Sequence, residues 1–270
     1  MRLDKNILVF IVTLLLFSCK SRQNGKDTFI SIDGTKIAYA DEGIGELVLL
    51  IHGFIVDGDV NWGKSELKKQ LLNQGYRVII PDLRGNGNSD KPQNEDAYKN
   101  DAEIKDLMAL IDYLAVENYV AVGYSRGSIV LANLLTKDNR ITKAVFGGMG
   151  IGFTNPNWNR RIDFGNVFSG RTEPNEMTRG AVNYAKNANV DFKILGYLQD
   201  YQPETSITEL NKISIKTLVI CGDKDIDNGN PKELQMELPN SKLSLVNGDH
   251  MSTFNSKGFA ESIINFLNEK

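Results

Sequence analysis

Short apolar segments recur along the chain, and most of them are continuous rather than alternating. Six such segments occur, at residues 47–51, 76–80, 119–123, 142–147, 215–221 and 241–246. Strands that are covered on both faces, as in a parallel sheet, are typically apolar throughout. These segments therefore predict six buried strands of a parallel sheet.

The segment 29–41 has a different pattern, because apolar and polar residues alternate on both sides of Asp33 and Gly34. An aspartate–glycine pair between two alternating segments indicates a hairpin with a two-residue turn. We therefore expect two antiparallel strands before the six buried ones, which gives a mostly parallel sheet of eight strands.

Between the strands, apolar residues recur with the spacing of a helix. In the segment 101–118 the apolar positions are Ile104, Leu107, Met108, Ile111 and Leu114. This spacing places them on one helical face, and Asn100 or Asp101 would be the N-cap. The alternation of strands and helices predicts a doubly wound α/β fold, with helices on both faces of the sheet and right-handed crossovers.

The stretch 152–210 interrupts this alternation, because it has no strand-like segment and mixes aromatic residues with Asn, Arg and Gly. We expect a small, mainly helical cap inserted between two strands; an enlarged helical crossover is the alternative. Four arginines of this stretch could attract an anionic substrate, although a solvated helical face is the more ordinary explanation. They are Arg160, Arg161, Arg171 and Arg179.

The first residues have the pattern of a secretory signal peptide, with Arg2 and Lys5 before the apolar segment 7–17. Eleven residues are too few to span a bilayer of about 30 Å. The sequence "LFSC" at 16–19 resembles the lipobox of bacterial lipoproteins, which implies a signal peptide over 1–18 and a lipid on Cys19. An ordinary secretory signal with a chance cysteine is the alternative.

The polar segment 19–27 is then expected to be a flexible tether to a domain over 28–270. The resemblance implies a lipid-anchored protein of the cell envelope of a Gram-negative bacterium, on the outer membrane or the periplasmic face. Cys221 is the only other cysteine, so lipidation of Cys19 would leave no disulfide, and we expect Cys221 to be a core residue. The formal net charge of -3 gives no reason to expect nucleic acid as a partner.

The sequence "AVGYSRGS" at 121–128 carries the clearest chemical signal. Here Ser125 stands between Gly123 and Gly127, after a predicted strand and before the helix-like segment 128–136. This is the context of a nucleophile elbow, a tight turn that exposes a serine hydroxyl at the N-terminus of a helix. The motif alone also arises by chance, and its position between strand and helix supports it here.

A serine hydroxyl needs a base to take its proton. The chain has two histidines, His52 and His250, and each follows a predicted strand at the edge of the sheet where Ser125 also lies. Either one could be a structural histidine. A carboxylate should follow the strand 215–221, where the candidates are Asp223, Asp225 and Asp227. A chain order of Ser, Asp and His fits a hydrolase triad.

Taken together, the chain over residues 28–270 resembles the α/β-hydrolase superfamily. The resemblance is carried by "LLIHGF" at 49–54, "IIPDLRGNGNSDKP" at 79–92, "VGYSRG" at 122–127, "GDKD" at 222–225 and "GDHM" at 248–251. It implies the α/β-hydrolase fold with a small helical cap over 152–210.

The resemblance also implies roles for individual residues. Asp225 would be the acid and His250 the base, with His52 structural. The N–H groups of Phe54 and Arg126 would form the oxyanion hole. An arginine at position 126 is a departure from the residues common there, and its side chain could either form a salt bridge or face the substrate.

The implied activity is a serine esterase that acts on a small-molecule ester and needs no metal or organic cofactor. An aspartate at position 125 would have indicated epoxide or haloalkane chemistry, which Ser125 argues against. The same triad also fits carbon–carbon bond hydrolysis, perhydrolysis or aminopeptidase activity. A ligand-binding sensor lipoprotein with low turnover is the alternative from another class. The substrate and the oligomeric state stay open.

Overall fold

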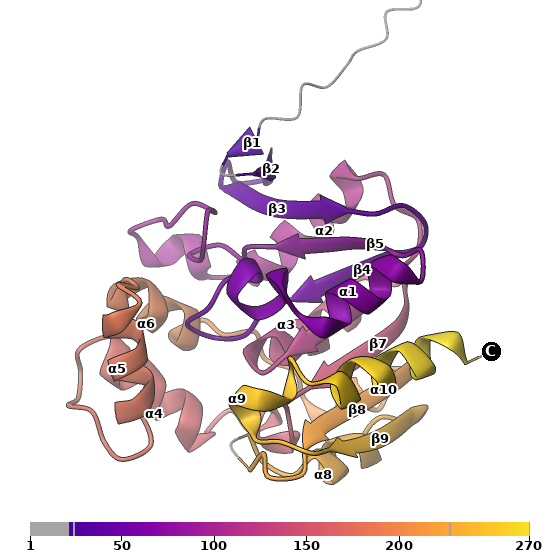
Figure 1. Ribbon diagram of the computed structural model, residues 1–270. Coiled ribbons are helices and arrows are strands. Elements are labelled where there is room, and N and C mark those ends of the chain that lie inside the picture. The colour runs from indigo at the N-terminus through magenta and orange to yellow at the C-terminus, as the bar shows by residue number, and fades with distance from the viewer. Residues whose placement is uncertain (1–21, 24, 227, 270) are drawn as a thin grey trace, which may run out of the picture.

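The computed structural model describes residues 22–23, 25–226 and 228–269. Cys19 and the signal-peptide segment lie outside the described residues. Among the described residues, one sheet of nine strands runs in the spatial order β1-β2-β3-β5-β4-β6-β7-β8-β9 (Figure 1). Its strands are β1 (Arg22–Gln23), β2 (Lys26–Ile30), β3 (Lys36–Glu42), β4 (Leu47–Ile51), β5 (Arg77–Pro81), β6 (Tyr119–Tyr124), β7 (Ile141–Gly147), β8 (Lys216–Gly222) and β9 (Ser241–Val246).

Ten α-helices connect and cover these strands in the described part of the chain. They are α1 (Glu66–Asn73), α2 (Ala102–Tyr113), α3 (Arg126–Leu135), α4 (Asn159–Phe168), α5 (Arg179–Asn187), α6 (Phe192–Asp200), α7 (Ile207–Leu210), α8 (Pro231–Met236), α9 (His250–Thr253) and α10 (Lys257–Asn268). A π-helical turn (Asp59–Gly63) and two 3-10 turns (Glu95–Tyr98 and Ile151–Thr154) complete the set.

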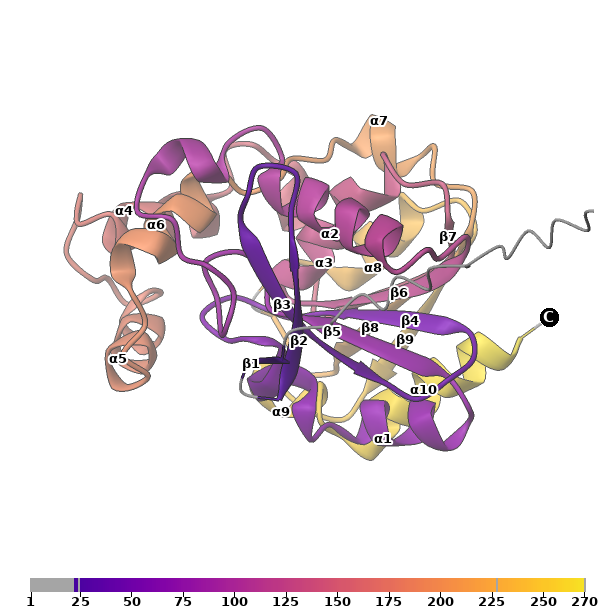
Figure 2. The same cartoon turned by 90° about the horizontal axis from the view of Figure 1, so that it is seen from above.

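The six continuous apolar segments form the parallel strands β4 to β9, as predicted. Strand β9 differs from the prediction of a buried strand, because it lies at the edge of the sheet and none of its residues is fully buried. Strand β4 shows why its residues are apolar throughout: Leu47, Leu49 and Ile51 belong to one hydrophobic cluster, and Val48 and Leu50 to another. The sheet is therefore packed on both faces. Figure 2 shows α2, α3 and α8 on one face, with α1, α9 and α10 on the other.

The predicted hairpin is confirmed as the antiparallel pair β2 and β3. Its turn is longer than the expected two residues. Ser31 N–H donates to the carbonyl of Thr35 at 2.8 Å, so the hydrogen bond encloses a turn of three residues. Gly34 has φ +87°, which an L-residue rarely adopts. Strand β2 also begins at Lys26, two residues before the expected domain boundary, and β1 adds a ninth strand of two residues.

The helix predicted after Asn100 is α2, and Asp101 occupies its N-cap position. The Asp101 side chain does not cap the helix, because it forms an ion pair with Lys137 and its backbone has φ 57°. The helical segment after Ser125 is α3, whose residues 126–134 are all buried.

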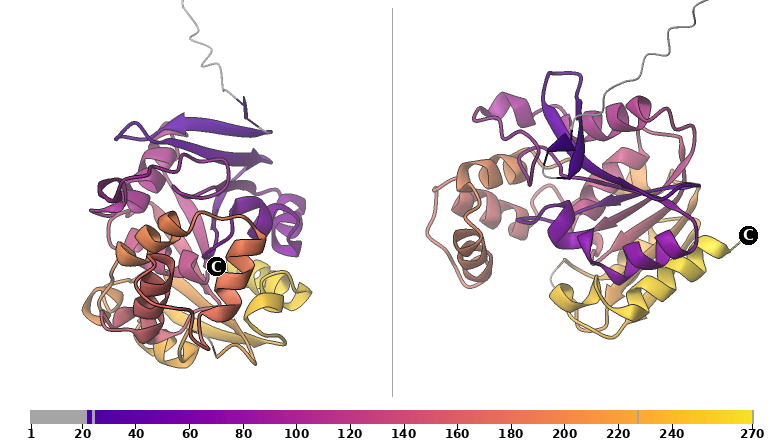
Figure 3. Two further views of the ribbon diagram at one scale, coloured as in Figure 1. Left: turned by 90° about the vertical axis from the view of Figure 1, so that its left-hand side faces the viewer. Right: turned by 45° about the horizontal axis from the view of Figure 1, so that its top comes forward.

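Residues 152–210 contain helices and no strand among the elements described, as expected for a helical cap. Helices α4, α5 and α6 share a hydrophobic cluster, which includes Phe164, Phe168 and Leu195 and extends to Ile55 and Tyr98 outside the cap. In Figure 1 these helices lie on the side toward which the arrowheads of β4 and β5 point, and Figure 3 shows them in front of that edge. They therefore cover the carboxyl edge of the parallel strands.

Helix α7 lies outside that cluster, and its Leu210 belongs to the core cluster that also contains residues of α2 and α3. No helix in the described part of the chain is long and apolar enough to cross a membrane.

Candidate active site

Ser125 lies in the sharp turn between β6 and α3. Its backbone has φ 53° and ψ −124°, outside the regions that L-residues normally adopt. The turn is held by Ser125 N–H, which donates to the carbonyl of Gly147 at 2.8 Å, and by Ser128 N–H, which donates to the carbonyl of Ser125 at 2.8 Å. Strained backbone of this kind is typical of functional sites.

The two glycines around Ser125 permit the close approach of neighbouring backbone. A Cβ on Gly123 would lie 2.4 Å from the carbonyl oxygen of Gly127, and a Cβ on Gly127 would lie 2.3 Å from that of Ile51. Neither distance is compatible with a side chain. The Gly-x-Ser-x-Gly pattern is therefore required by the packing of β6, α3 and β4.

The structure brings together three side chains that are far apart in the sequence. His250 Nε2 lies 3.0 Å from Ser125 Oγ, and His250 Nδ1 lies 2.8 Å from Asp225 Oδ2. The carboxylate of Asp225 can only accept a hydrogen bond, so Nδ1 carries the proton and Nε2 accepts from the serine hydroxyl. This is the arrangement in which a neutral imidazole can take the proton of Ser125.

The three aspartates proposed for the acid position have different places. Asp225 contacts His250, and its side chain is 2% exposed. Asp223 instead accepts the N–H of Gly248 at 3.0 Å, so it fixes the backbone of the loop that carries His250. Asp227 lies outside the described residues. Of the two described candidates, Asp225 is the one in contact with the imidazole.

The loop that carries His250 is held at several points. His250 begins the short helix α9, and the carboxylate of Asp249 accepts the N–H groups of Met251 and Ser252. Beneath the imidazole, Tyr124 donates its hydroxyl to the carbonyl of His250 at 2.5 Å, and the two rings lie 5.3 Å apart. These contacts fix the direction of the ring.

Tyr124 was not singled out as a site residue by the sequence analysis. It is buried, and its ring contacts the aromatic rings of Trp62 and Phe259 and the imidazole of His250. Its position directly before Ser125 was visible in the sequence. Its hydrogen-bond partner, the carbonyl of His250, lies 126 residues later in the chain. This contact could not be predicted from the sequence, because it depends on the position of the loop after β9.

His52 follows β4 and contacts backbone alone through its two ring nitrogens. The N–H of Leu83 donates to Nε2 at 3.0 Å, so Nδ1 carries the proton and donates to the carbonyl of Gly53 at 2.8 Å. Burial lowers the pKa of His52 and outweighs the opposite influence of the Gly53 carbonyl and Asp82. His52 is thus a neutral structural link between two loops.

Of the two residues predicted to form an oxyanion hole, Arg126 directly follows Ser125, and Phe54 belongs to a loop that packs against Ser125. Arg126 is the first residue of α3, so its N–H is one of those that no turn of the helix can pair. Phe54 belongs to the loop after β4, where Gly53 N–H is held by Asn61 at 2.9 Å. A Cβ on Gly53 would lie 3.4 Å from the Cβ of Ser125. The loop therefore packs directly against the serine.

The side chain of Arg126 forms a salt bridge, one of the two alternatives stated above. Its Nη1 and Nη2 donate to the two carboxylate oxygens of Glu103 at 2.9 and 2.6 Å, and Nη2 also donates to the carbonyl of Leu198 at 2.8 Å. This pair links α3, α2 and the cap helix α6. Glu103 was not recognised from the sequence, because nothing in its own segment marks it as the partner of Arg126.

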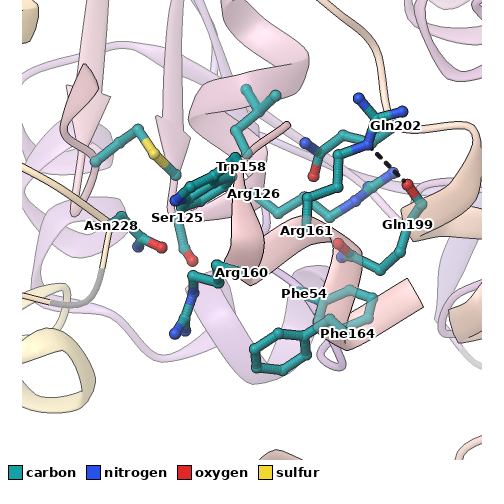
Figure 4. Close-up of a pocket in the computed structure, with 12 residues that line it drawn as sticks. Phe54, Ser125, Arg126, Trp158, Arg160, Arg161, Phe164, Gln199, Gln202 and Asn228 are labelled. Carbon is teal, nitrogen blue, oxygen red and sulfur yellow. Dashed lines mark hydrogen bonds between the residues drawn. The ribbon is translucent and has the colours of Figure 1, made fainter. Parts of the chain in front are cut away.

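A cavity opens in front of Ser125; about 340 Å³ of space, the open solvent at its mouth included, is free of protein atoms. Its walls come from the oxyanion loop, the elbow, the cap and the segment before α8. The lining residues are Phe54, Ser125, Arg126, Ile129, Met149, Trp158, Arg160, Arg161, Phe164, Gln199, Gln202 and Asn228 (Figure 4).

Cys221 is buried on β8, as predicted, and burial raises the pKa of its thiol to about 12. It is therefore protonated at neutral pH and unsuited to act as a nucleophile. Among the described residues, no three His, Cys, Asp or Glu side chains gather in a group that could hold a metal ion.

Comparison with known proteins agrees with this geometry. The family model described as "alpha/beta hydrolase fold" matches residues 46–161. A putative non-heme chloroperoxidase of Synechocystis is 41% identical over 123 residues, which are 45% of this chain and 42% of that protein. An epoxide hydrolase 3 of Siraitia grosvenorii is 37% identical over 101 residues, which are 37% of this chain and 31% of that protein. The chain thus spans less than half the length of these two relatives.

Longer matches also exist. Lipase 1 of Psychrobacter immobilis is 30% identical over 217 residues, which cover 71% of this chain and 67% of that protein. The crystal structure of a bromoperoxidase from Bacillus anthracis superposes with a TM-score of 0.73 at 26% identity, covering 90% of this chain and all of that one. With the match to the lipase, the family model and the shared fold, the chain belongs to the α/β-hydrolase superfamily.

Proposed function

We propose that the protein is an exported serine hydrolase that cleaves carboxylic esters of small molecules through an acyl-enzyme. The observation that carries the proposal is the hydrogen-bonded series Ser125, His250 and Asp225, with distances of 3.0 and 2.8 Å. The lipase among the similar proteins supports ester chemistry. No step of the proposed reaction requires a metal or an organic cofactor.

In the first half of the reaction, Ser125 Oγ attacks the carbonyl carbon of the ester while His250 Nε2 takes its proton. Asp225 holds the imidazole in the required tautomer and stabilises its charged form. The negative charge that develops on the carbonyl oxygen is stabilised by the N–H groups of Phe54 and Arg126 and by the N-terminus of α3. His250 then gives its proton to the alcohol that leaves.

In the second half, water attacks the acyl group bound to Ser125. His250 again acts as the base, takes a proton from this water and returns one to the serine oxygen as the acid is released. Each carbonyl attack uses the same two amides, so the loss of one donor should slow both halves by about 10²–10³.

The test is labelling of the purified protein with a fluorophosphonate, followed by assay on aryl esters of increasing chain length. We expect one label per chain, absent in Ser125→Ala, and hydrolysis of at least one ester. Folded protein that is not labelled would instead favour a ligand-binding sensor. Labelling without ester hydrolysis would direct the assay to capped amides and to carbon–carbon bond cleavage.

Perhydrolysis is a second candidate, because the similar proteins include a putative non-heme chloroperoxidase and a bromoperoxidase. In this reaction hydrogen peroxide, rather than water, attacks the acyl group on Ser125, and a peroxycarboxylic acid is released. The assay is peroxyacid formation from an ester and hydrogen peroxide. An acyl-enzyme that is resolved faster by peroxide than by water at equal concentration would favour this activity.

The proposal of export rests on residues 1–19 and is tested separately. We propose that Cys19 carries the lipid that anchors the protein in the cell envelope. The expected result is incorporation of labelled fatty acid that Cys19→Ser abolishes, together with release of that variant into the soluble fraction. Membrane attachment that survives in Cys19→Ser would count against a lipid on this residue.

A further inference from the structure

We propose that Lys26 is a positioning residue of the active site. Through its ion pair with Asp82 it holds in place the loop of residues 53–63, which carries the Phe54 amide. We call these residues the oxyanion loop. The inference rests on the proposed function, because it assigns the residue that keeps one of the two oxyanion donors in position.

The backbone of the oxyanion loop has an uncommon conformation. Ile55 directly follows Phe54 and has φ 64°, a value that a β-branched residue rarely adopts. Residues Asp59–Gly63 form a π-helical turn, which is rare in proteins and frequent at functional sites. Strained backbone of this kind persists only where surrounding groups hold it. The shape of the loop therefore depends on its contacts.

Two buried side chains hold the loop on either side of the Phe54 amide. Asn61 Oδ1 accepts the N–H of Gly53 at 2.9 Å, and Asp82 Oδ1 accepts the N–H of Gly58 at 3.0 Å. Asn61 belongs to the loop itself, whereas Asp82 directly follows strand β5. The contact with Asp82 therefore fixes the loop to the sheet.

Asp82 is itself held firmly. Its residue is 0% exposed, and its Oδ2 accepts the N–H of Asn88 at 2.8 Å. A Cβ on Gly87 would lie 2.4 Å from this carboxylate, so the backbone of the following turn encloses it closely. A buried carboxylate of this kind is stable only with a positive partner and further hydrogen bonds.

Lys26 supplies the positive charge. Its Nζ donates to Asp82 Oδ1 at 2.6 Å, and its side chain is 4% exposed. The same oxygen accepts the N–H of Gly58, so the ammonium group and the loop share one acceptor atom. Lys26 Nζ also lies 3.1 Å from Asp59 Oδ2, which belongs to the loop. Lys26 therefore contacts both the loop and the group that fixes it to the sheet.

The position of Lys26 in the chain gives this contact its significance. The predicted tether over 19–27 includes Lys26, which the structure instead places at the start of β2. Lysine is rarely buried in a folded protein unless it is paired. The segment that leads from the proposed lipid anchor therefore ends in a residue that supports the active site.

Loss of the ammonium group should displace the loop. The Asp82 carboxylate would keep its charge without a partner, and such a group draws in water or takes up a proton. Either change weakens its hydrogen bond to the N–H of Gly58. A displacement of about 1 Å in a group that acts on the reacting atoms can slow a reaction by about 10².

The experiment compares Lys26→Met with Lys68→Met in the full chain. Lys68 is the matched control, because it forms an ion pair of the same length, 2.6 Å, with Glu42 and joins α1 to β3. The substrate is 4-nitrophenyl acetate. Active sites are counted by fluorophosphonate labelling carried to completion, so that unfolded protein does not enter kcat.

We expect kcat per labelled site to fall by about ten- to a hundredfold in Lys26→Met. KM should change by less than about threefold, because the oxyanion donors act on charge that develops in the transition state of both halves of the reaction. The rate constant of labelling should fall by a similar factor, because the phosphonyl oxygen uses the same donors. In Lys68→Met, kcat, KM and the rate constant of labelling should each change by less than about twofold, the effect of a partly exposed ion pair.

Three kinetic results would overturn the inference and leave the proposed function intact. They are an unchanged kcat in Lys26→Met, an effect on KM alone, and equal losses of kcat in Lys26→Met and Lys68→Met. The last result would mean that breaking any ion pair of this length has the same consequence.

Asp59→Ala tests the inference if Lys26→Met does not fold. The Asp59 side chain is 58% exposed, so its removal leaves the buried pair intact and breaks only the direct contact between Lys26 and the loop. We expect kcat to fall by about two- to fivefold with KM unchanged, the range for an exposed ion pair. Asp96→Ala, which breaks the exposed pair of Asp96 and Lys99, is its control. Equal kcat in these two variants would overturn the inference.

Hydrogen exchange provides an arm that does not depend on catalysis. Amides of residues 53–58 should exchange faster in Lys26→Met than in the unaltered protein, by a larger factor than amides of α10, and should be unchanged in Lys68→Met. If the unaltered protein is neither labelled nor active, the proposed function fails. The exchange comparison then decides alone: faster exchange at 53–58 supports the role of Lys26 in holding the loop, and unchanged exchange overturns it.

Discussion

The two histidines of the chain follow strands β4 and β9, which three other strands separate, and the structure gives them opposite surroundings. His52, after β4, is 1% exposed and uses both ring nitrogens to join backbone groups of two loops. His250, after β9, places its ring between Asp225 and Ser125. The ring nitrogens of His52 are hydrogen-bonded to backbone groups. Those of His250 contact the side chains of Asp225 and Ser125, and Ser125 can give up a proton.

This difference shows that the partners of the two ring nitrogens decide what a histidine can do. The Nε2 of His52 accepts an amide N–H, which cannot give up its proton at neutral pH. The Nε2 of His250 faces a hydroxyl, which can be deprotonated once an acyl carbon is in reach. We therefore predict the effects of substitutions at His250 and its loop, and then at His52.

The largest effect is expected from His250→Ala. Loss of the base should lower kcat by about 10⁴ to 10⁶, because Ser125 is a poor nucleophile without it. The melting temperature should fall moderately, because the substitution removes the imidazole partner of the buried Asp225 carboxylate. The measurements are ester hydrolysis and circular dichroism melting. A variant that keeps a tenth of the activity would show that another group takes the proton.

The next effect separates two aspartates of one loop. Asp225→Asn should lower kcat by about 10⁴, since an amide can hold His250 in the wrong tautomer. Asp223→Asn is the matched control: Asp223 accepts the Gly248 N–H, which an amide oxygen can also do, so kcat should fall less than tenfold. Comparable losses in the two variants would mean that Asp225 acts only on the loop.

A smaller effect, on stability rather than chemistry, is expected from His52→Ala. The buried N–H of Leu83 and carbonyl of Gly53 would lose their partner, at about 1–3 kcal/mol for each group. We therefore expect the free energy of unfolding to fall by about 2–6 kcal/mol in urea titrations. The folded fraction should still react with fluorophosphonate. Loss of labelling in folded protein would assign His52 a direct part in the reaction.

Most of the fold could be predicted from the sequence, because its strongest signals come from residues that are close together in the chain. The alternate sorting of Leu47 to Ile51 into two clusters requires apolar residues at every position, and that requirement is visible as a continuous segment. The tight backbone contacts at Gly123 and Gly127 are likewise visible in the sequence, because no residue other than glycine fits at these positions. A motif of this kind therefore located Ser125, whereas the two histidines were found because the sequence has no others.

Contacts between segments that are far apart in the chain produce no such pattern in the sequence. Glu103 pairs with Arg126 only because α2 and α3 lie side by side, and Tyr124 contacts the carbonyl of His250 only because the loop after β9 folds back over it. The four arginines of the cap also look equivalent in the sequence. The structure separates them, since Arg160 and Arg161 line the cavity, whereas Arg171 pairs with Asp200 and Arg179 is exposed.

The smallest predicted effect is the contribution of His52 to the pH dependence of the free energy of unfolding. Burial keeps the folded-state pKa of His52 below its ordinary value, so between that lowered pKa and about 6.5 the unfolded chain binds a proton that the folded protein does not. Stability contributed by this group is therefore present above pH 6.5 and is lost as the pH falls toward the lowered pKa. By linkage the loss between pH 7.5 and 5.5 is at most about 1.4 kcal/mol.

The measurement is the free energy of unfolding at these two pH values in the unaltered protein and in His52→Gln, which cannot titrate there. We expect the loss on acidification to be about 1 kcal/mol smaller in the variant, even though the variant is less stable at both values. The difference between the two losses cancels every other titrating group that the substitution leaves undisturbed. Equal losses would show that His52 takes up its proton in the folded state as readily as in the unfolded chain. The two backbone bonds that define its structural role would then have to survive protonation, which the acceptor role of Nε2 toward Leu83 does not allow.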